Sequence, residues 1–129
     1  VFPHKEEFCS FVVGGWGGGV VGLSSVDGNY ANENSTGTAG VFKNEQWYRL
    51  RLRVGDNFVR AWIDDKNVVD LDLTDHKLSV HPAVDLAKPL GITCYSTVSG
   101  LRDIHIRTLT EDEAAGKETD FRPLKSAKE

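Results

Sequence analysis

The stretch WYRLRLRVGDNFVRAWIDDKNVVDLDL, residues 47–73, decides the fold class. Apolar and polar residues alternate along it, which is the period of a half-buried β-strand. Turn residues interrupt the alternation twice, at Gly55-Asp56 and at Asp64-Asp65-Lys66. The pattern therefore predicts three consecutive antiparallel strands, at 46–54, 57–63 and 68–73.

A two-residue loop with glycine first is typical of a type II′ hairpin turn, so Gly55-Asp56 fixes a register for the first two strands. On the core face this register pairs Leu50 with Ala61 and Leu52 with Val59. On the other face it pairs Arg49 with Trp62, Arg51 with Arg60, and Arg53 with Phe58. Because opposed arginines repel each other, anionic groups are expected nearby.

The third strand supplies these anionic groups if residues 64–66 form a three-residue loop. Val69 and Leu71 then join the core, while Asp70 and Asp72 lie beside Arg60 and Phe58 on the arginine face. We therefore predict one dry face, with Leu50 and Leu52 in it. The opposite face is expected to be a lattice of arginine and aspartate that also holds Trp62 and Trp47.

Other strand-like stretches flank this meander, separated by the glycine-rich run 14–19 and the polar loop 27–35. These stretches are 8–13, 20–25, 77–80, 90–97 and 101–109. Many short strands at such spacing are typical of a sandwich or barrel. We predict one all-β domain of antiparallel strands over residues 1–109. Residues 110–129 read as a charged tail, flexible or loosely docked, with Phe121 and Leu124 as an apolar pair.

Composition excludes several classes of protein. The 129 residues suit one domain, and the formal net charge is −4 with arginines and acids interleaved. No basic run is present, which disfavours nucleic-acid binding, and no apolar stretch approaches the roughly 20 residues that span a bilayer. Cys9 and Cys94 both lie in apolar, strand-like contexts, so they are either two buried thiols or a disulfide.

Trp16 lies in the middle of the glycine-rich run GGWGGG. An exposed tryptophan there could stack on the C–H face of a sugar ring, or it could cap the end of the core. The run also matches the dinucleotide fingerprint G-x-G-x-x-G. That interpretation needs a helix to follow, whereas Val20 and Val21 begin a strand.

The loop DGNYANEN, residues 27–34, is rich in oxygen-bearing side chains. Asp27, Asn29 and Glu33 are candidate ligands for Ca²⁺, which prefers such oxygens in a bent loop. Asn32 and Glu33 are equally candidates for contact with sugar hydroxyls. Ordinary turn chemistry explains the same composition, so the alternatives stay open.

The candidate ligand-binding residues are those of the polar face and of these two loops: Trp16, Asn32, Glu33, Trp47, Arg49, Arg51, Arg60 and Trp62. The histidines lack zinc-ligand spacing, and no nucleophile elbow is present. The sequence therefore identifies no catalytic residue.

Several runs, taken in order, resemble one known family: CSFVVGGWGGGVVGLSSVDGNYANENST, WYRLRLRV, AWIDDKNVVDLDL and AKPLGITCYSTVSGLRDIHIR. The chain is similar over residues 1–109 to the planctomycete type of the DUF1080 family, also called the 3-keto-disaccharide hydrolase domain. The resemblance implies a concanavalin A-like jelly-roll sandwich that is exported, to the periplasm or outside the cell, and associated with carbohydrate.

Family members have further strands before the segment that matches Val1-Phe2-Pro3. We therefore expect the first strands of the sandwich to come from another chain, from a cleaved N-terminal part or from preceding sequence. The expected function is a glycan-binding module or a structural domain of a larger exported protein. The alternative is a hydrolase acting on 3-keto-glycosides or disaccharides.

Overall fold

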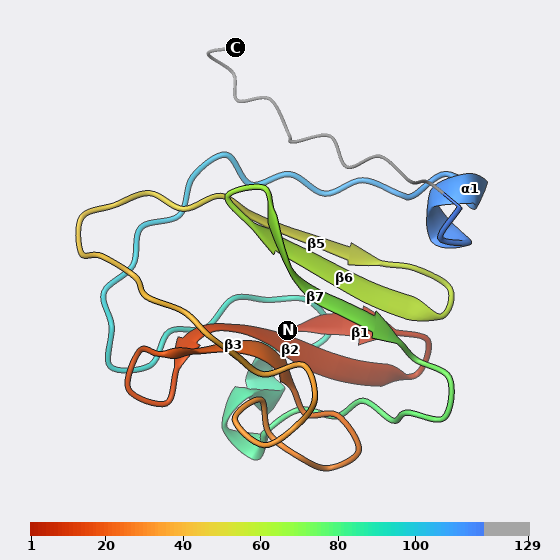
Figure 1. Ribbon diagram of the computed structural model, residues 1–129, viewed down its shortest axis with the longest axis horizontal. Coiled ribbons are helices and arrows are strands. Elements are labelled where there is room, and N and C mark those ends of the chain that lie inside the picture. Colours follow the sequence, from red (N-terminus) through yellow and green to blue (C-terminus); the bar gives the residue numbers. More distant parts are fainter. Residues whose placement is uncertain (118–129) are drawn as a thin grey trace.

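The computed structural model describes residues 1–117, in which two antiparallel sheets lie one above the other (Figure 1). The lower sheet has the order β1-β2-β3-β4, formed by Phe2–His4, Glu7–Gly15, Val20–Ser24 and Thr38–Ala39. The upper sheet has the order β5-β6-β7, formed by Leu50–Val54, Phe58–Ile63 and Lys66–Asp72. A 3-10 helix η1 spans Pro82–Ala87 and a helix α1 spans Glu111–Ala114. The predicted all-β, antiparallel class is confirmed.

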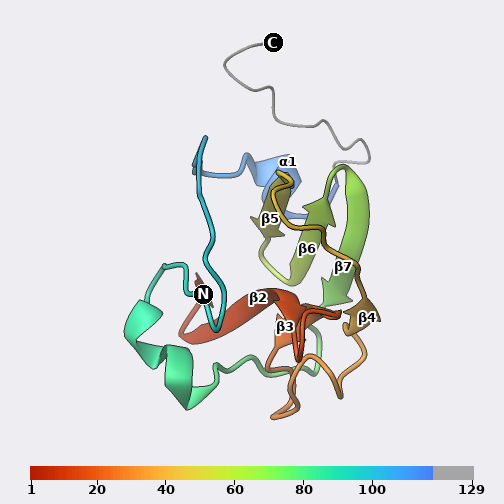
Figure 2. The same cartoon turned by 90° about the vertical axis from the view of Figure 1, so that its left-hand side faces the viewer.

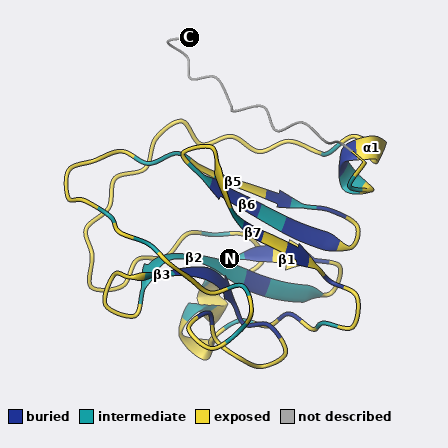
Figure 3. Ribbon diagram, viewed as in Figure 1, coloured by how far each residue is buried: buried dark blue, intermediate teal, exposed yellow. Residues whose placement is uncertain are grey.

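The core lies between the two sheets, where the buried residues of β2, β3, β6 and β7 gather (Figure 3). Leu23 of β3, Cys9 of β2 and Val59 of β6 are fully buried. Burying each aliphatic side chain of this size contributes roughly 1.5–3 kcal/mol. The sheets meet most closely where β3 contacts β7. Among residues 1–117, no helix is long and apolar enough to cross a bilayer.

The β5–β6 hairpin has the predicted faces, but the predicted register is wrong by two residues. The observed pairs are Leu50–Ile63, Arg51–Trp62, Leu52–Ala61, Arg53–Arg60 and Val54–Val59. The turn residues are Asp56-Asn57, because the N–H of Gly55 donates to the carbonyl of Phe58 at 2.9 Å. A side chain at Gly55 would clash with the Phe58 ring, so the glycine is needed for space. Since the shift is even, every side chain keeps its face.

The β6–β7 turn also differs from the prediction, yet the strands pair as expected beyond it. The turn has two residues, Asp64-Asp65, both with positive φ, which is typical of a type I′ hairpin. A bulge at Val68 then adds the residue that the shorter turn leaves out. Arg60 therefore faces Asp70, and Phe58 faces Asp72, as predicted.

The prediction that Leu50 and Leu52 lie in the core is wrong. They are 48% and 37% exposed, although they point to the same side of the sheet as Val59 and Ala61. The reason is position: β5 is the edge strand of its sheet, and the contacts between the two sheets run through β3 and β7. Viewed from the side, β5 stands apart from the lower sheet (Figure 2).

The predicted strands at 90–97 and 101–109 are also wrong, because both stretches are irregular and largely exposed. Gly91 exchanges two backbone hydrogen bonds with Val1, at 2.8 and 3.2 Å, but no ladder follows. Ile104 and Ile106 are exposed, so their alternation is not used by any sheet within residues 1–117. The predicted strand at 77–80 is reduced to a single bridge between Leu78 and Val26.

The two cysteines are free and differ in environment. Cys9 is buried as predicted, and its burial raises the pKa of the thiol to about 12. Cys94 is exposed, which contradicts the prediction of a buried residue. Its stretch is irregular, so it has no sheet face on which to be buried.

Residues 110–117 of the charged C-terminal segment are docked against the upper sheet. Thr110 and Glu113 form a capping box around the first turn of α1. The carbonyl of Ala114 accepts a hydrogen bond from the N–H of Asp56 at 2.8 Å. The predicted apolar pair Phe121 and Leu124 lies outside the described residues.

Candidate functional site

Three loops bring together an aromatic cluster formed by Trp16, Tyr30 and His81. The ring centroids of Trp16 and Tyr30 are 6.2 Å apart, and those of Tyr30 and His81 are 5.1 Å apart. Trp16 is 48% exposed and Tyr30 is 37% exposed, and His81 is exposed as well. Large aromatic faces open to solvent on loops suit the stacking of a ring-shaped ligand.

The glycine-rich run places Trp16 in the turn between β2 and β3. Trp16 has φ of 47°, and Gly17 and Gly18 have φ of 83° and 100°. The amides of Gly18 and Gly19 both donate to the carbonyl of Gly15 at 3.1 Å, which closes the turn. Gly17 and Gly18 allow the left-handed backbone of this turn. Because Trp16 is about half exposed at the start of the turn, it does not cap the core but projects from the turn.

The second loop is held by Asn34, whose side chain makes four hydrogen bonds. Its amide group donates to the carbonyls of Leu23 and Asn29 at 2.7 and 2.9 Å. Its carbonyl oxygen accepts from the N–H and the hydroxyl of Thr36 at 2.9 and 2.6 Å. This network ties the loop that carries Tyr30 to strand β3, so Tyr30 is presented from an ordered turn.

His81 is the N-cap of η1, and this role fixes its tautomer. Its Nδ1 accepts a hydrogen bond from the N–H of Ala83 at 2.9 Å. The neutral ring therefore carries its proton on Nε2, which remains a donor. Pro82 follows at the first helical position, where its fixed φ suits a helix start.

The other predicted residues of this loop have different surroundings. Asn32 and Glu33 are exposed and lie two and three residues after Tyr30. Asp27 accepts hydrogen bonds from Nδ1 of His76 at 2.6 Å and from the N–H of Lys77 at 2.8 Å. These bonds, chiefly the one from His76, lower the pKa of the Asp27 carboxyl.

Of the candidate calcium ligands, Asp27 and Asn29 are engaged in other hydrogen bonds, and Glu33 is exposed. Asn29 uses its backbone to pair with Val26, and its carbonyl also accepts from Asn34. Within residues 1–117, no group of three or more histidine, cysteine, aspartate or glutamate side chains is placed to hold a metal ion.

The arginine face of the upper sheet is closed rather than open. Trp62 is only 7% exposed, with the guanidinium carbons of Arg51 and Arg53 at 5.9 and 5.7 Å from its ring centroid. Arg60 lies 4.3 Å from the ring centroid of Phe58 and bonds Asp70 at 3.2 Å. Trp62, which was predicted as a ligand contact, is therefore covered, because Arg51 and Arg53 stack on its ring, while Asp70 pairs with Arg60.

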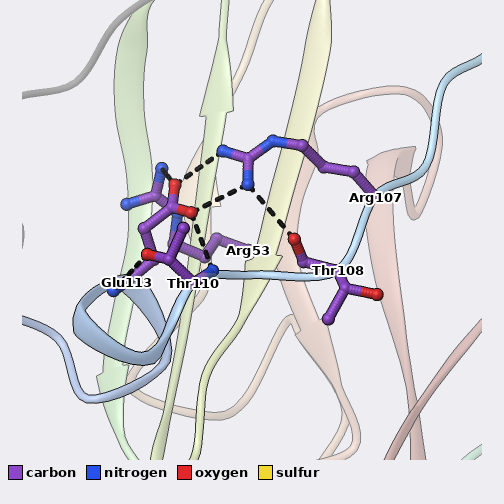
Figure 4. Close-up of polar contacts among 5 residues, drawn as sticks. All are labelled: Arg53, Arg107, Thr108, Thr110 and Glu113. Carbon is purple, nitrogen blue, oxygen red and sulfur yellow. Dashed lines mark hydrogen bonds and ion pairs between the residues drawn. The ribbon is translucent and has the colours of Figure 1, made fainter.

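Glu113 of α1 completes this closed face (Figure 4). Arg107 contacts both of its carboxylate oxygens, at 2.8 and 2.6 Å, and Arg53 approaches at 3.5 Å. The side chains of Arg53 and Glu113 are almost fully buried, whereas that of Arg107 is half exposed. This ion-pair cluster of Arg53, Arg107 and Glu113 holds residues 107–113 against the upper sheet.

Trp47 and Arg49 lie before β5 and outside the aromatic cluster. Trp47 is 53% exposed, and the guanidinium of Arg102 stacks over its ring at 4.0 Å. Arg49 donates its N–H to the carboxylate of Asp64 at 2.8 Å. Of the eight predicted ligand-binding residues, the structure thus places only Trp16 in the aromatic cluster. Asn32 and Glu33 follow another member of the cluster, Tyr30, by two and three residues.

Sequence reasoning missed Tyr30 and His81. A tyrosine inside the otherwise polar loop 27–35 was the available signal for Tyr30, and a histidine before proline was the signal for a helix cap at His81. No spacing connects positions 16, 30 and 81, because the fold alone brings these loops together.

A hollow of about 470 Å³ lies next to this cluster along the chain. It is lined by Glu6, Glu7, Phe8, Leu78, Ser79, Val80, Pro82, Asp85 and Lys88. Pro82, which directly follows His81, is the lining residue nearest to the cluster in sequence, and the rings of Trp16, Tyr30 and His81 do not line the hollow. A second hollow, of about 250 Å³, opens between the sheets near Phe42 and Tyr48.

Comparisons with known proteins add no relative. No protein-family model matches the chain, and neither does any curated protein or solved structure.

Proposed function

We propose that this chain is a carbohydrate-binding module whose contacts centre on Trp16, Tyr30 and His81. The observation that carries the proposal is the exposure of two large aromatic rings on ordered loops beside a histidine that offers a donor. Sugar rings present C–H groups on a face and hydroxyls around the rim. Aromatic planes with a polar tip beside them match that chemistry.

The sequence resemblance supports the same proposal. It implies a carbohydrate association, export from the cell and a concanavalin A-like jelly roll as the parent architecture. The two stacked antiparallel sheets are compatible with that architecture. Asn32 and Glu33 are the polar residues that we assign to hydroxyl contacts at the rim of the cluster.

Calorimetric titration with neutral oligosaccharides, preceded by a glycan-array screen, tests the proposal. Trp16→Ala should weaken binding at least tenfold, which corresponds to about 1.4 kcal/mol. Trp47→Ala is the matched control, because Trp47 is equally exposed but stacks with Arg102. Equal binding by the wild type and Trp16→Ala, or loss only in Trp47→Ala, would remove the cluster from the function.

Hydrolysis of 3-keto-glycosides is a second candidate, favoured by the pairing of Asp27 with His76. A carboxylate that holds Nδ1 of a partly exposed histidine leaves Nε2 to accept a proton, as a general base requires. Incubation with a 3-keto-glucoside, with and without Ca²⁺, should show turnover that His76→Ala abolishes. An absence of turnover by the wild type would reject this candidate and leave glycan binding intact.

We also propose that further β-strands cover the exposed apolar side of β5, as the resemblance implies. Leu50 and Leu52 are exposed on the side that faces the core elsewhere in the sheet, and an uncovered edge strand of this kind is prone to pair. Sedimentation and binding of an apolar dye test this. We expect the chain to self-associate or to bind the dye, and Leu52→Glu to suppress both. A wild-type chain that stays monomeric and binds no dye would contradict this proposal.

A further inference from the structure

The hollow beside the aromatic cluster is unevenly charged. Glu6, Glu7 and Asp85 line it with three carboxylates, and Lys88 is the one basic residue among its lining residues. Nζ of Lys88 lies 2.7 Å from Asp85, and it also lies 4.9 Å from the ring centroid of Phe8. The charge of this ammonium group is thus already balanced by Asp85.

The remaining carboxylates of the hollow have no basic side chain beside them in the lining. Glu7 accepts a hydrogen bond from the N–H of Leu78 at 3.0 Å, which holds its carboxylate in place. Glu6 is exposed at the same turn between β1 and β2. The lining therefore carries a net negative charge at neutral pH.

The loops that carry the cluster have the same sign of charge. Residues 9–42 contain no lysine and no arginine, but they include Asp27 and Glu33. Nδ1 of His81 is already occupied as the acceptor for the N–H of Ala83. A carboxylate or sulfate on a sugar would therefore meet no lysine or arginine from residues 9–42, and it would meet the carboxylates of the hollow.

We infer that the cluster and the adjoining hollow form one extended site that selects glycans without negative charge and favours sugars with a protonated amine. This inference rests on the proposed carbohydrate binding and adds the ligand class. The aromatic rings stack on one sugar unit. A volume of about 470 Å³ is large enough for the next unit, whose amine would lie among the carboxylates.

Titration with three oligosaccharides of equal length tests the inference: a glucosamine oligomer, a cello-oligosaccharide and an oligogalacturonate. The titrations are run at about pH 6, above the ordinary pKa range of a carboxyl group. We expect the glucosamine oligomer to bind at least as tightly as the cello-oligosaccharide, and both to bind at least tenfold more tightly than the oligogalacturonate. Added salt should weaken the glucosamine complex and leave the neutral one unchanged.

Charge reversal locates the effect. Glu6→Lys should narrow the difference between glucosamine and galacturonate oligomers at least threefold, whereas Glu45→Lys, an exposed acid outside the hollow, should leave it unchanged. Tightest binding of the oligogalacturonate, with Trp16→Ala still weakening all three ligands, would overturn the inference and preserve the proposed function. No binding of any of the three would overturn both.

Discussion

Replacing Glu113 with alanine should destabilise the protein by about 3 kcal/mol, because three groups depend on its carboxylate. Buried Arg53 loses its ion pair with Glu113, Arg107 loses the two hydrogen bonds that it donates to Glu113, and the capping box of α1 disappears. Breaking a buried ion pair by removing one partner costs about 3–5 kcal/mol. The lower figure applies here, because release of the short helix lets water reach Arg53.

Urea unfolding followed by circular dichroism measures this change, and the midpoint of thermal unfolding should fall by roughly 10 °C. Glu113→Gln retains an acceptor for the N–H of Thr110 but loses the charge, so it should cost an intermediate amount. Glu111→Ala is the matched control, because Glu111 is an exposed acid in the same helix. If the free energy of unfolding of Glu113→Ala lies within about 0.5 kcal/mol of that of this control, the usual size of a neutral surface change, the stabilising role of the Arg53, Arg107 and Glu113 cluster is refuted.

Three further outcomes follow from single side chains. Under native conditions a thiol reagent should label Cys94 alone, and Cys9 should react only at the rate of unfolding, since burial raises its pKa to about 12; fast labelling of both would contradict this. Asn34→Ala should lower the free energy of unfolding by about 1–3 kcal/mol in urea titrations, because the carbonyl of buried Leu23 loses its donor, whereas Asn32→Ala at an exposed position should change it little. The hydrogen bond from His76 lowers the pKa of Asp27 in the folded protein. The stability that this carboxylate contributes is therefore present above its unfolded pKa of 3.8 and is lost as the pH falls through the folded pKa. Asp27→Asn should flatten the acid unfolding curve in that range, and an unchanged curve would count against the hydrogen bond.

The central meander was predictable because its signal is local. Period-two alternation over 47–73 assigned β5, β6 and β7, and the pairs of β6 with β7 at Asp70 and Asp72 follow from it. The turns were less predictable, since Gly55 is required for the space of the Phe58 ring rather than for its own conformation. Because the β5–β6 register differs from the predicted one by two residues, each side chain still lies on its predicted face of the sheet.

Burial was not predictable, because it depends on what lies opposite a face. Leu50 and Leu52 carry the same alternation as Val59 and Ala61, yet only the inner strand is covered by the other sheet. The stretch 101–109 alternates in the same way but forms no strand, so alternation alone does not decide whether a strand forms.

The candidate site was predictable only in part for a related reason. Trp16 was identified from its glycine-rich turn, but Tyr30 and His81 reach it through tertiary packing of distant loops. Trp62 looked like an exposed ligand contact because its neighbours alternate as polar residues. In the folded chain those same arginines cover its ring.

Nuclear magnetic resonance of the tryptophan indole N–H groups tests the assignment of the sugar site most directly. The chain has three tryptophans, so three indole signals can be followed while an oligosaccharide is added. The signal of Trp16 should shift with saturation, while that of the buried Trp62 should stay fixed and that of Trp47 should move little. A saturating shift of Trp62 or Trp47 with Trp16 unmoved would contradict the account.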